Sequence, residues 1–120
     1  MTSEHKLIVA GGRDFEDYAL LTEKIFKYVN TELNNQTLAI VSGMARGADS
    51  LAVRFAREQR VRLYEYPADW NLGRGAGFIR NKAMGDFADG LLAFWSGSNG
   101  TRNMIEYMLK LNKPVRIVRY

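Results

Sequence analysis

The sequence predicts a single α/β domain spanning residues 1–120, in which helices cover both faces of a five-stranded parallel sheet to give three layers. Two observations support this prediction. Short apolar runs of strand length alternate along the chain with longer segments, and those segments carry apolar residues at spacings of three and four. Repeated strand–helix units of this size favour a parallel sheet covered by helices.

The elements can be placed in order along the chain. The expected strands are 6–10, 38–41, 61–66, 90–95 and 114–118. The four helices between them are indicated by apolar stripes: Tyr18, Leu21, Ile25, Val29 and Leu33; Ala48, Leu51, Ala52, Phe55 and Ala56; Ile79, Ala83 and Phe87; and Met104, Met108 and Leu111. A polar, glycine-containing loop at 67–77 precedes the third helix.

The pattern within the runs also predicts the strand order. Runs 6–10, 38–41 and 90–95 are continuously apolar, as expected for strands covered on both faces. Runs 61–66 and 114–118 alternate between apolar and polar residues, which is typical of half-exposed edge strands. Edges at the third and fifth strands fit the order 3-2-1-4-5. The order 2-1-3-4-5 fits less well, because it would place the apolar second strand at an edge.

Composition excludes several classes of site. The chain has no cysteine, so disulfides, zinc–thiolate sites and cysteine nucleophiles are excluded. The single histidine, His5, falls in a polar lead before the first strand, which argues against a zinc site or a histidine-based triad. No run approaches the length of a membrane span and residues 1–6 lack an apolar core, so we expect a cytoplasmic protein without a secretory signal. The net charge of +4 suits an anionic partner.

Three glycine-rich loops are expected to meet at one edge of the sheet. The order 3-2-1-4-5 places the topological switch point between strands 6–10 and 90–95, where open α/β sheets bind their ligands. Loops 11–15 and 96–101 flank that point, and loop 42–49 lies beside them. Each precedes a helix, whose free N–H groups favour phosphate. The loops contain neither a Walker A sequence nor an intact G-x-G-x-x-G, so we expect a phosphate-bearing ligand rather than a P-loop nucleotide hydrolase.

Arginines near these loops strengthen the expectation of phosphate, because guanidinium forks match phosphate oxygens. Arg13 and Arg80 rank highest, while Arg46, Arg74 and Arg102 are equally compatible with plain surface positions. For other nearby residues the sequence is compatible with more than one role. The hydroxyls of Ser42, Ser98 and Thr101 suit phosphate or helix capping, and Asp14 and Asp49 suit a ribose, Mg²⁺ or a helix N-terminus. Trp70 and Phe15 are candidates for stacking on a base, whereas Trp95 is expected in the core.

Several segments resemble a known superfamily. "VSGMARGADSLA" is similar to a segment of the DNA-processing protein DprA (Smf), and "GFIRNKAMGDFADGLLAFWSGSNGT" follows the later pattern of that family. "AGGRDF" and the "PADW…G…AG..RN..M" stretch resemble more closely the YspA-like branch of the SLOG superfamily, which also includes the LOG phosphoribohydrolases. The resemblance runs from about residue 6 to 118. It implies a Rossmann-like domain that binds nucleotides or nucleotide-derived ligands, in a superfamily that often forms homodimers.

The residues and the resemblance together give the expected site. The predicted ligand contacts are Gly11, Gly12, Arg13, Asp14, Phe15, Ser42, Gly43, Met44, Ala45, Gly47, Asp49, Trp70, Arg80, Asn81, Gly97, Ser98, Gly100 and Thr101. The leading hypothesis is a module that senses or sequesters a nucleotide or a ligand derived from NAD or ADP-ribose, with no resident metal or cofactor firmly implied.

Catalysis is not carried over by the resemblance. Asn103 and Met104 stand where the LOG enzymes have an acidic residue, so no catalytic residue is assigned. A nucleotide hydrolase that uses Asp14, Asp49, Asp69 or Glu106 is the alternative. DprA-like DNA binding is a further alternative, weakened because the aromatic residues fall mostly at core positions rather than among basic ones.

Overall fold

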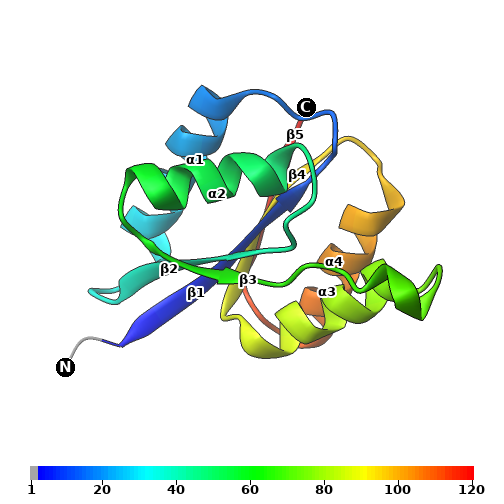
Figure 1. Ribbon diagram of the computed structural model, residues 1–120. Coiled ribbons are helices and arrows are strands. Elements are labelled where there is room, and N and C mark those ends of the chain that lie inside the picture. The colour runs from blue at the N-terminus through cyan, green and yellow to red at the C-terminus, as the bar shows by residue number, and fades with distance from the viewer. Residues whose placement is uncertain (1–2) are drawn as a thin grey trace.

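Five parallel strands form one sheet in the order β3-β2-β1-β4-β5 in the computed structural model, which describes residues 3–120 (Figure 1). The strands are β1 (Glu4–Gly11), β2 (Thr37–Ser42), β3 (Arg62–Glu65), β4 (Gly90–Trp95) and β5 (Val115–Arg119). The predicted strand order is therefore confirmed. Neither edge strand contains a fully buried residue, whereas β4 is buried from Gly90 to Phe94, because only the inner strands are covered on both faces.

The helices divide between the two faces of the sheet. α1 (Tyr18–Glu32) and α2 (Ala48–Glu58) pack on one face, and α3 (Ala76–Phe87) and α4 (Asn99–Lys110) pack on the other (Figure 1). A short 3-10 helix, η1 (Trp70–Leu72), leads into α3. The predicted Rossmann-like three-layer arrangement is confirmed. No helix in residues 3–120 has the length and apolar character needed to cross a membrane.

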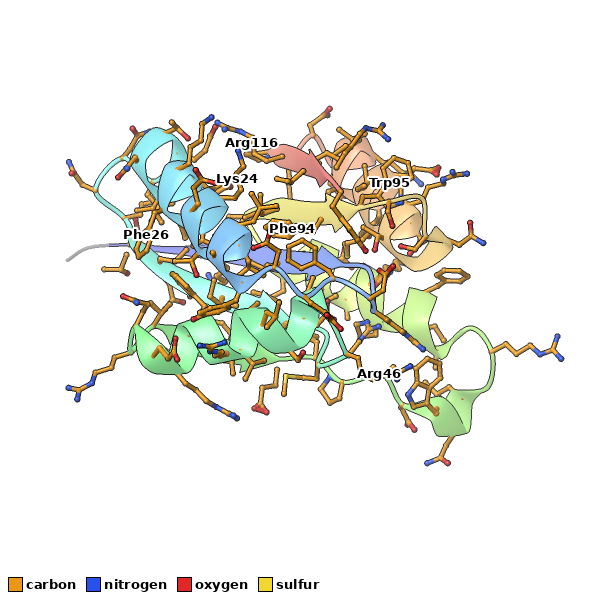
Figure 2. The ribbon with its side chains drawn as sticks, turned by 90° about the horizontal axis from the view of Figure 1, so that it is seen from above. Lys24, Phe26, Arg46, Phe94, Trp95 and Arg116 are labelled. Carbon is orange, nitrogen blue, oxygen red and sulfur yellow. The ribbon has the colours of Figure 1, made fainter. Side chains whose placement is uncertain are left out.

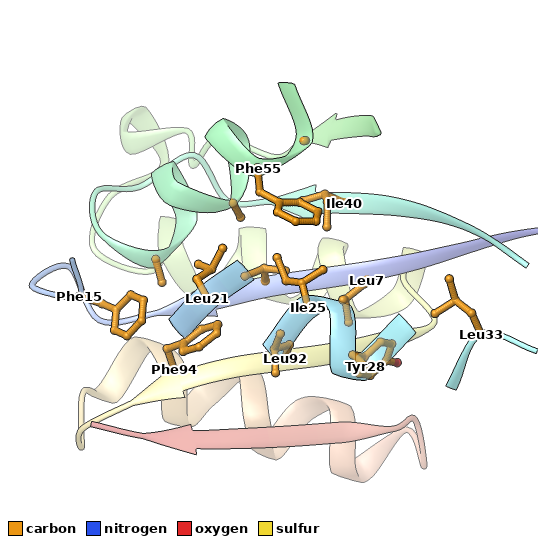
Figure 3. Close-up of a cluster of buried hydrophobic side chains, with 14 residues drawn as sticks. Leu7, Phe15, Leu21, Ile25, Tyr28, Leu33, Ile40, Phe55, Leu92 and Phe94 are labelled. Atoms are coloured by element: carbon orange, nitrogen blue, oxygen red, sulfur yellow. The ribbon is translucent and has the colours of Figure 1, made fainter. Parts of the chain in front are cut away.

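The alternation of side chains along β1 divides the core into two clusters. Leu7 and Val9 point toward α1 and α2, while Ile8 and Ala10 point toward α3 and α4. Figure 3 shows the first cluster, in which α1 and α2 place apolar side chains over the central strands, with Phe55 against Ile40. This packing holds the C-terminal ends of β1, β2 and β4 at one edge of the molecule.

The predicted apolar stripe of the third helix is wrong at two of its three positions, since only Phe87 packs against the core. Ile79 is 54% exposed and Ala83 is exposed, whereas Met84 and Gly85 are buried against the sheet and α4. A Cβ atom on Gly85 would lie 2.5 Å from the ring of Tyr107, so glycine allows α3 and α4 to approach closely on this face. The close approach decides which side of α3 is buried.

His5 does not belong to a polar lead, as predicted, but to β1. Its side chain is 6% exposed, and Nε2 lies 2.9 Å from the hydroxyl of Tyr28 on α1. The strand begins two residues earlier than its apolar run because Glu4 and His5 continue the parallel pairing with β2. His5 is therefore a hydrogen-bonded core residue, far from the glycine-rich loops.

Candidate ligand pocket at the switch point

The glycine-rich loops meet where β1 and β4 end side by side. Gly11 pairs with Phe94, and the N–H of Gly12 donates to the carbonyl of Phe94 over 3.1 Å. A Cβ atom on Gly11 would lie 2.4 Å from that carbonyl oxygen, so only glycine allows the two strands to approach this closely. This is the predicted switch point, and a large cavity opens beside it.

The main cavity has a volume of about 660 Å³ and lies on the α3–α4 side of the sheet edge. Its floor is apolar and is formed by the buried side chains of Ala10, Met84 and Met104. Trp70 of η1 and Phe78 of α3 line it while remaining 60% and 51% exposed. An apolar floor with aromatic rings at the rim and a few convergent polar groups is typical of small-molecule sites.

The β2–α2 loop rests directly on the β1–α1 loop. Gly47 has a φ of +76°, and a Cβ atom there would lie 2.1 Å from the carbonyl oxygen of Gly12. The N–H of Ala48 donates to that same oxygen over 3.3 Å. The two loops thus form one continuous wall, as their shared sheet edge predicts.

The β1–α1 loop is held in place by contacts with the C-terminal residue, Tyr120. The hydroxyl of Tyr120 donates to Asp14 Oδ1 over 2.5 Å, and the C-terminus lies beside this loop (Figure 1). Phe15 is 2% exposed and packs between Phe94 and Tyr120, with ring centroids 4.6 and 5.0 Å apart. These contacts fix the loop from which Arg13 projects into the cavity.

Arg80 spans the gap between α3 and the neighbouring strand ends. Its guanidinium donates to the carbonyl of Gly43, with a longer contact of 3.4 Å to the carbonyl of Tyr66, and its Nε donates to Asn81 Oδ1 over 3.1 Å. Burial lowers the pKa of Arg80, the carboxyl of Asp49 acts in the opposite sense, and Arg13 lowers it further. No carboxylate among residues 3–120 forms an ion pair with Arg80. A half-buried cation without an ion-pair partner is suited to binding an anion.

Asp49 lies at the back of the same wall. Asp49 is 6% exposed, and its Oδ2 accepts a hydrogen bond from the N–H of Ala45 over 3.3 Å. Burial raises the pKa of Asp49 to about 6, although the Ala45 N–H, Arg80 and Arg13 all act to lower it. A carboxyl that titrates near neutrality inside a cavity is a feature of functional sites.

The raised pKa of Asp49 predicts a specific pH dependence of stability. Between pH 3.8 and about 6 the carboxyl of Asp49 is protonated in the folded protein but ionised in the unfolded chain. The free energy of unfolding of the wild type therefore falls as the pH rises through this range, and the contribution of the protonated carboxyl is lost above about pH 6. In Asp49→Asn, the stability relative to wild type should therefore be about 2 kcal/mol more favourable at pH 7.5 than at pH 4.5. Urea unfolding at both values measures this difference. An equal effect of the substitution at the two values would show that Asp49 does not titrate in this range.

Three helix N-termini at this edge carry no side-chain cap. The N-cap residues of α2, α3 and α4 are Gly47, Gly75 and Ser98, and none of their side chains bonds to a first-turn N–H. By contrast, Asp17 caps α1 through the N–H of Leu20. The first-turn N–H groups of a helix have no partner within the helix. At α2 and α3 the first of these groups, on Ala48 and Ala76, donate to the carbonyls of Gly12 and Gly73. The first turn of α4, which lines the cavity through Gly100 and Thr101, is the terminus best suited to an anion.

The hydroxyls at the start of α4 bond to each other, and α3 is tied to this turn. Ser98 Oγ donates to Thr101 Oγ1 over 3.0 Å instead of capping the helix. Asn81 is 6% exposed, and its amide donates to the carbonyl of Gly100 over 3.1 Å and to Asn103 Oδ1 over 3.0 Å. Asn81 thereby links α3 to the first turn of α4. Its neighbour Arg80 instead links α3 to Gly43 and Tyr66, at the ends of β2 and β3.

Most of the predicted contact residues lie on the main cavity or on a smaller one next to it. The residues that line at least one of the two are Gly11, Gly12, Arg13, Asp14, Gly43, Met44, Ala45, Asp49, Trp70, Arg80, Asn81, Ser98, Gly100 and Thr101. Phe15, Ser42, Gly47 and Gly97 line neither cavity.

Two of these four have internal roles that differ from those predicted. The ring of Phe15 is buried against Phe94 and is not available to stack on a base. Ser42 is fully buried, and its hydroxyl donates to the carbonyl of Asp49 and accepts from the N–H of Met44. Gly47 allows the β1–α1 and β2–α2 loops to approach each other closely, as described above. Trp95, which was expected in the core, is only partly buried and is flanked by Arg102 and Arg119.

Several lining residues are absent from the predicted site. Ala10 and Met104 are predicted core positions, whereas Met84 lies outside the stripe predicted for the third helix. All three belong to the buried cluster on this side of the sheet and also line the cavity. Gly77 ends the loop predicted at 67–77 and Phe78 follows it, so their position in the turn of α3 that precedes Arg80 is a signal that could have found them. Ser96 lies in a predicted loop but carried no separate signal.

The comparison with known families decides the classification of the chain. Residues 5–73 match the model of the YspA, cpYpsA-related SLOG family (YAcAr), which is more than half of the 120 residues. The chain belongs to this family. A search of curated proteins finds no match to the chain.

Membership of the SLOG family indicates a ligand-binding or nucleotide-related role. The matched region contains both glycine-rich loops of the wall, together with Asp49 and Trp70. Arg80 and the first turn of α4 lie beyond the matched residues, so the cavity extends past the part of the chain that the family match covers. Residues 3–120 contain no group of three or more His, Cys, Asp or Glu that could hold a metal ion.

Proposed function

We propose that this SLOG protein binds a nucleotide, or a ligand derived from NAD or ADP-ribose, in the main cavity, and acts as a sensor or a sequestering module. The observation that carries the proposal is Arg80, a half-buried guanidinium that lines the cavity without an ion-pair partner among the described residues. Arg13 faces the same space from the β1–α1 loop. Two arginines beside uncapped helix termini form a site for phosphate.

The rest of the cavity suits the remaining parts of such a ligand. The exposed ring of Trp70 can stack on a base, and Asp14 has a second carboxylate oxygen for a ribose hydroxyl, since Tyr120 donates to Oδ1. The apolar floor excludes water from under the ligand. A volume of about 660 Å³ lies within the range of about 300–1,000 Å³ that is common for small-molecule sites.

Calorimetric titration with AMP, ADP, NAD, ADP-ribose and the corresponding guanine, cytosine and uracil nucleotides tests the proposal. The expected result is saturable binding of at least one of them, accompanied by quenching of Trp70 fluorescence that disappears in Trp70→Phe. The residual signal from Trp95 provides an internal reference. An absence of heat with every compound, in a preparation whose circular dichroism shows a folded protein, would refute the proposal.

A second candidate function is hydrolysis of an N-glycosidic or phosphoester bond in the same ligand. It is favoured by Asp49, a buried carboxyl in the cavity wall whose pKa near 6 allows it to exchange a proton at neutral pH. The expected outcome is slow turnover by the wild type that is lost in Asp49→Asn, while binding is retained. Chromatography of the bound nucleotide after long incubation makes the distinction, since an unchanged nucleotide favours pure binding.

A further inference from the structure

A second, smaller cavity adjoins the main one beneath the β2–α2 loop. This side cavity has a volume of about 340 Å³ and is lined by Gly43, Met44, Arg46, Pro67 and Ala68 together with residues it shares with the main cavity. The shared residues are Arg13, Ala45, Trp70 and Arg80. The two spaces are therefore neighbours, and Arg13 and Arg80 stand at their boundary.

The two cavities differ in charge. The main cavity has carboxylates, Asp14 and Asp49, as well as its arginines. The described residues that line the side cavity include three arginines, Arg13, Arg46 and Arg80, and no acidic residue. Three guanidinium groups around a small space repel one another, and a phosphate among them would remove that repulsion while accepting several hydrogen bonds.

The backbone of the β2–α2 loop maintains this arrangement. Met44 has a φ of +62°, an uncommon conformation for a residue other than glycine. Its N–H is held by the Ser42 hydroxyl over 3.1 Å, and the next N–H in the loop, that of Ala45, is held by Asp49. The loop then presents Arg46 at the edge of the molecule between α2 and α3 (Figure 2). Unfavourable backbone conformations that are locked by neighbouring bonds cluster at ligand sites.

We propose that the side cavity is a second phosphate subsite, and that the ligand is a nucleotide with two or more phosphates in a chain rather than a nucleoside monophosphate. This inference rests on the nucleotide binding proposed above. The base and ribose occupy the main cavity, the first phosphate lies at the boundary between Arg13 and Arg80, and the next phosphate enters the side cavity toward Arg46. A group attached beyond that phosphate, such as a second ribose, extends past Pro67 toward solvent.

Two exposed arginines form a matched pair for the test, because Arg46 lines only the side cavity and Arg74 lines only the main cavity. AMP, ADP and ADP-ribose are titrated by calorimetry into wild type, Arg46→Ala and Arg74→Ala. In the wild type, ADP and ADP-ribose should bind about tenfold or more tightly than AMP. Arg46→Ala should lose about tenfold in affinity for ADP and ADP-ribose with little change for AMP. Arg74→Ala should weaken all three by the same factor.

The outcomes separate this inference from the proposed function. If AMP binds and ADP binds no more tightly, or if Arg46→Ala weakens AMP and ADP equally, the second subsite is refuted while nucleotide binding stands. If the wild type binds neither these three nucleotides nor NAD nor the guanine, cytosine and uracil counterparts, the proposed function fails first and the subsite fails with it.

Discussion

Replacing Arg80 with alanine is expected to weaken binding of the nucleotide ligand by about a hundredfold, or about 2.7 kcal/mol, which would be the largest loss from any single side chain of the pocket. Arg80 lines both cavities and forms no ion pair with a carboxylate in residues 3–120, so its charge is available to the ligand. Its contacts with Gly43 and Tyr66 also fix its position before binding. Calorimetry with the tightest nucleotide of the panel measures the loss.

Two further variants separate charge from geometry. Arg80→Lys keeps the positive charge but cannot bond to a loop carbonyl and present a fork to phosphate at the same time, so we expect an intermediate loss of about tenfold. Arg57→Ala removes an equally positive but exposed side chain of α2 that lies away from both cavities, and should leave affinity unchanged. If Arg80→Ala binds as tightly as Arg57→Ala, Arg80 is not the phosphate ligand. Thermal unfolding of each variant shows whether a loss of binding reflects a loss of fold.

The strand order could be predicted from the sequence because each strand shows, in its own pattern of apolar and polar residues, whether one or both of its faces are covered. Runs 61–66 and 114–118 alternate while the other three do not, and an edge strand alternates because water covers one of its faces. The face of α3 was not predictable in this way. Apolar residues occur on more than one side of that helix, with Ile79 and Met84 on different sides, so its sequence is compatible with more than one buried stripe. The contact between Gly85 and Tyr107 of α4 selects the stripe, and no local pattern encodes that contact.

The site shows the same limit. Loop positions were predictable, because every βα loop ends at one edge of a parallel sheet. The roles of individual side chains depend on distant contacts, as Phe15 and Trp70 illustrate. Both are aromatic residues within predicted loops, but Phe15 is buried by Phe94 and by Tyr120 at the far end of the chain, whereas Trp70 is 60% exposed. The side cavity was likewise invisible in the sequence, because it forms only where the β2–α2 and β3–α3 loops face each other.

The second large effect is expected at Gly47, where alanine should destabilise the fold by about 3 kcal/mol and lower the midpoint of thermal unfolding by about 10 °C. Gly47 has φ +76° and ψ −128°, a conformation that side chains other than glycine rarely adopt. A Cβ atom there would lie 2.1 Å from the carbonyl oxygen of Gly12 and 2.7 Å from Arg13 Cα. Both are backbone atoms, so no rotation of a side chain relieves the collision.

Gly100→Ala is the matched control for Gly47→Ala. Gly100 lines the same pocket from the first turn of α4, but a Cβ atom there would meet open space, and alanine suits a helical position. Its stability should be unchanged or raised by about 0.5 kcal/mol. Because relief at Gly47 requires the β1–α1 and β2–α2 loops to separate, any Gly47→Ala protein that still folds should also lose nucleotide binding, since Arg13 moves with the first loop and Arg46 with the second. Wild-type stability and affinity in Gly47→Ala would mean that the two loops do not form a single rigid wall.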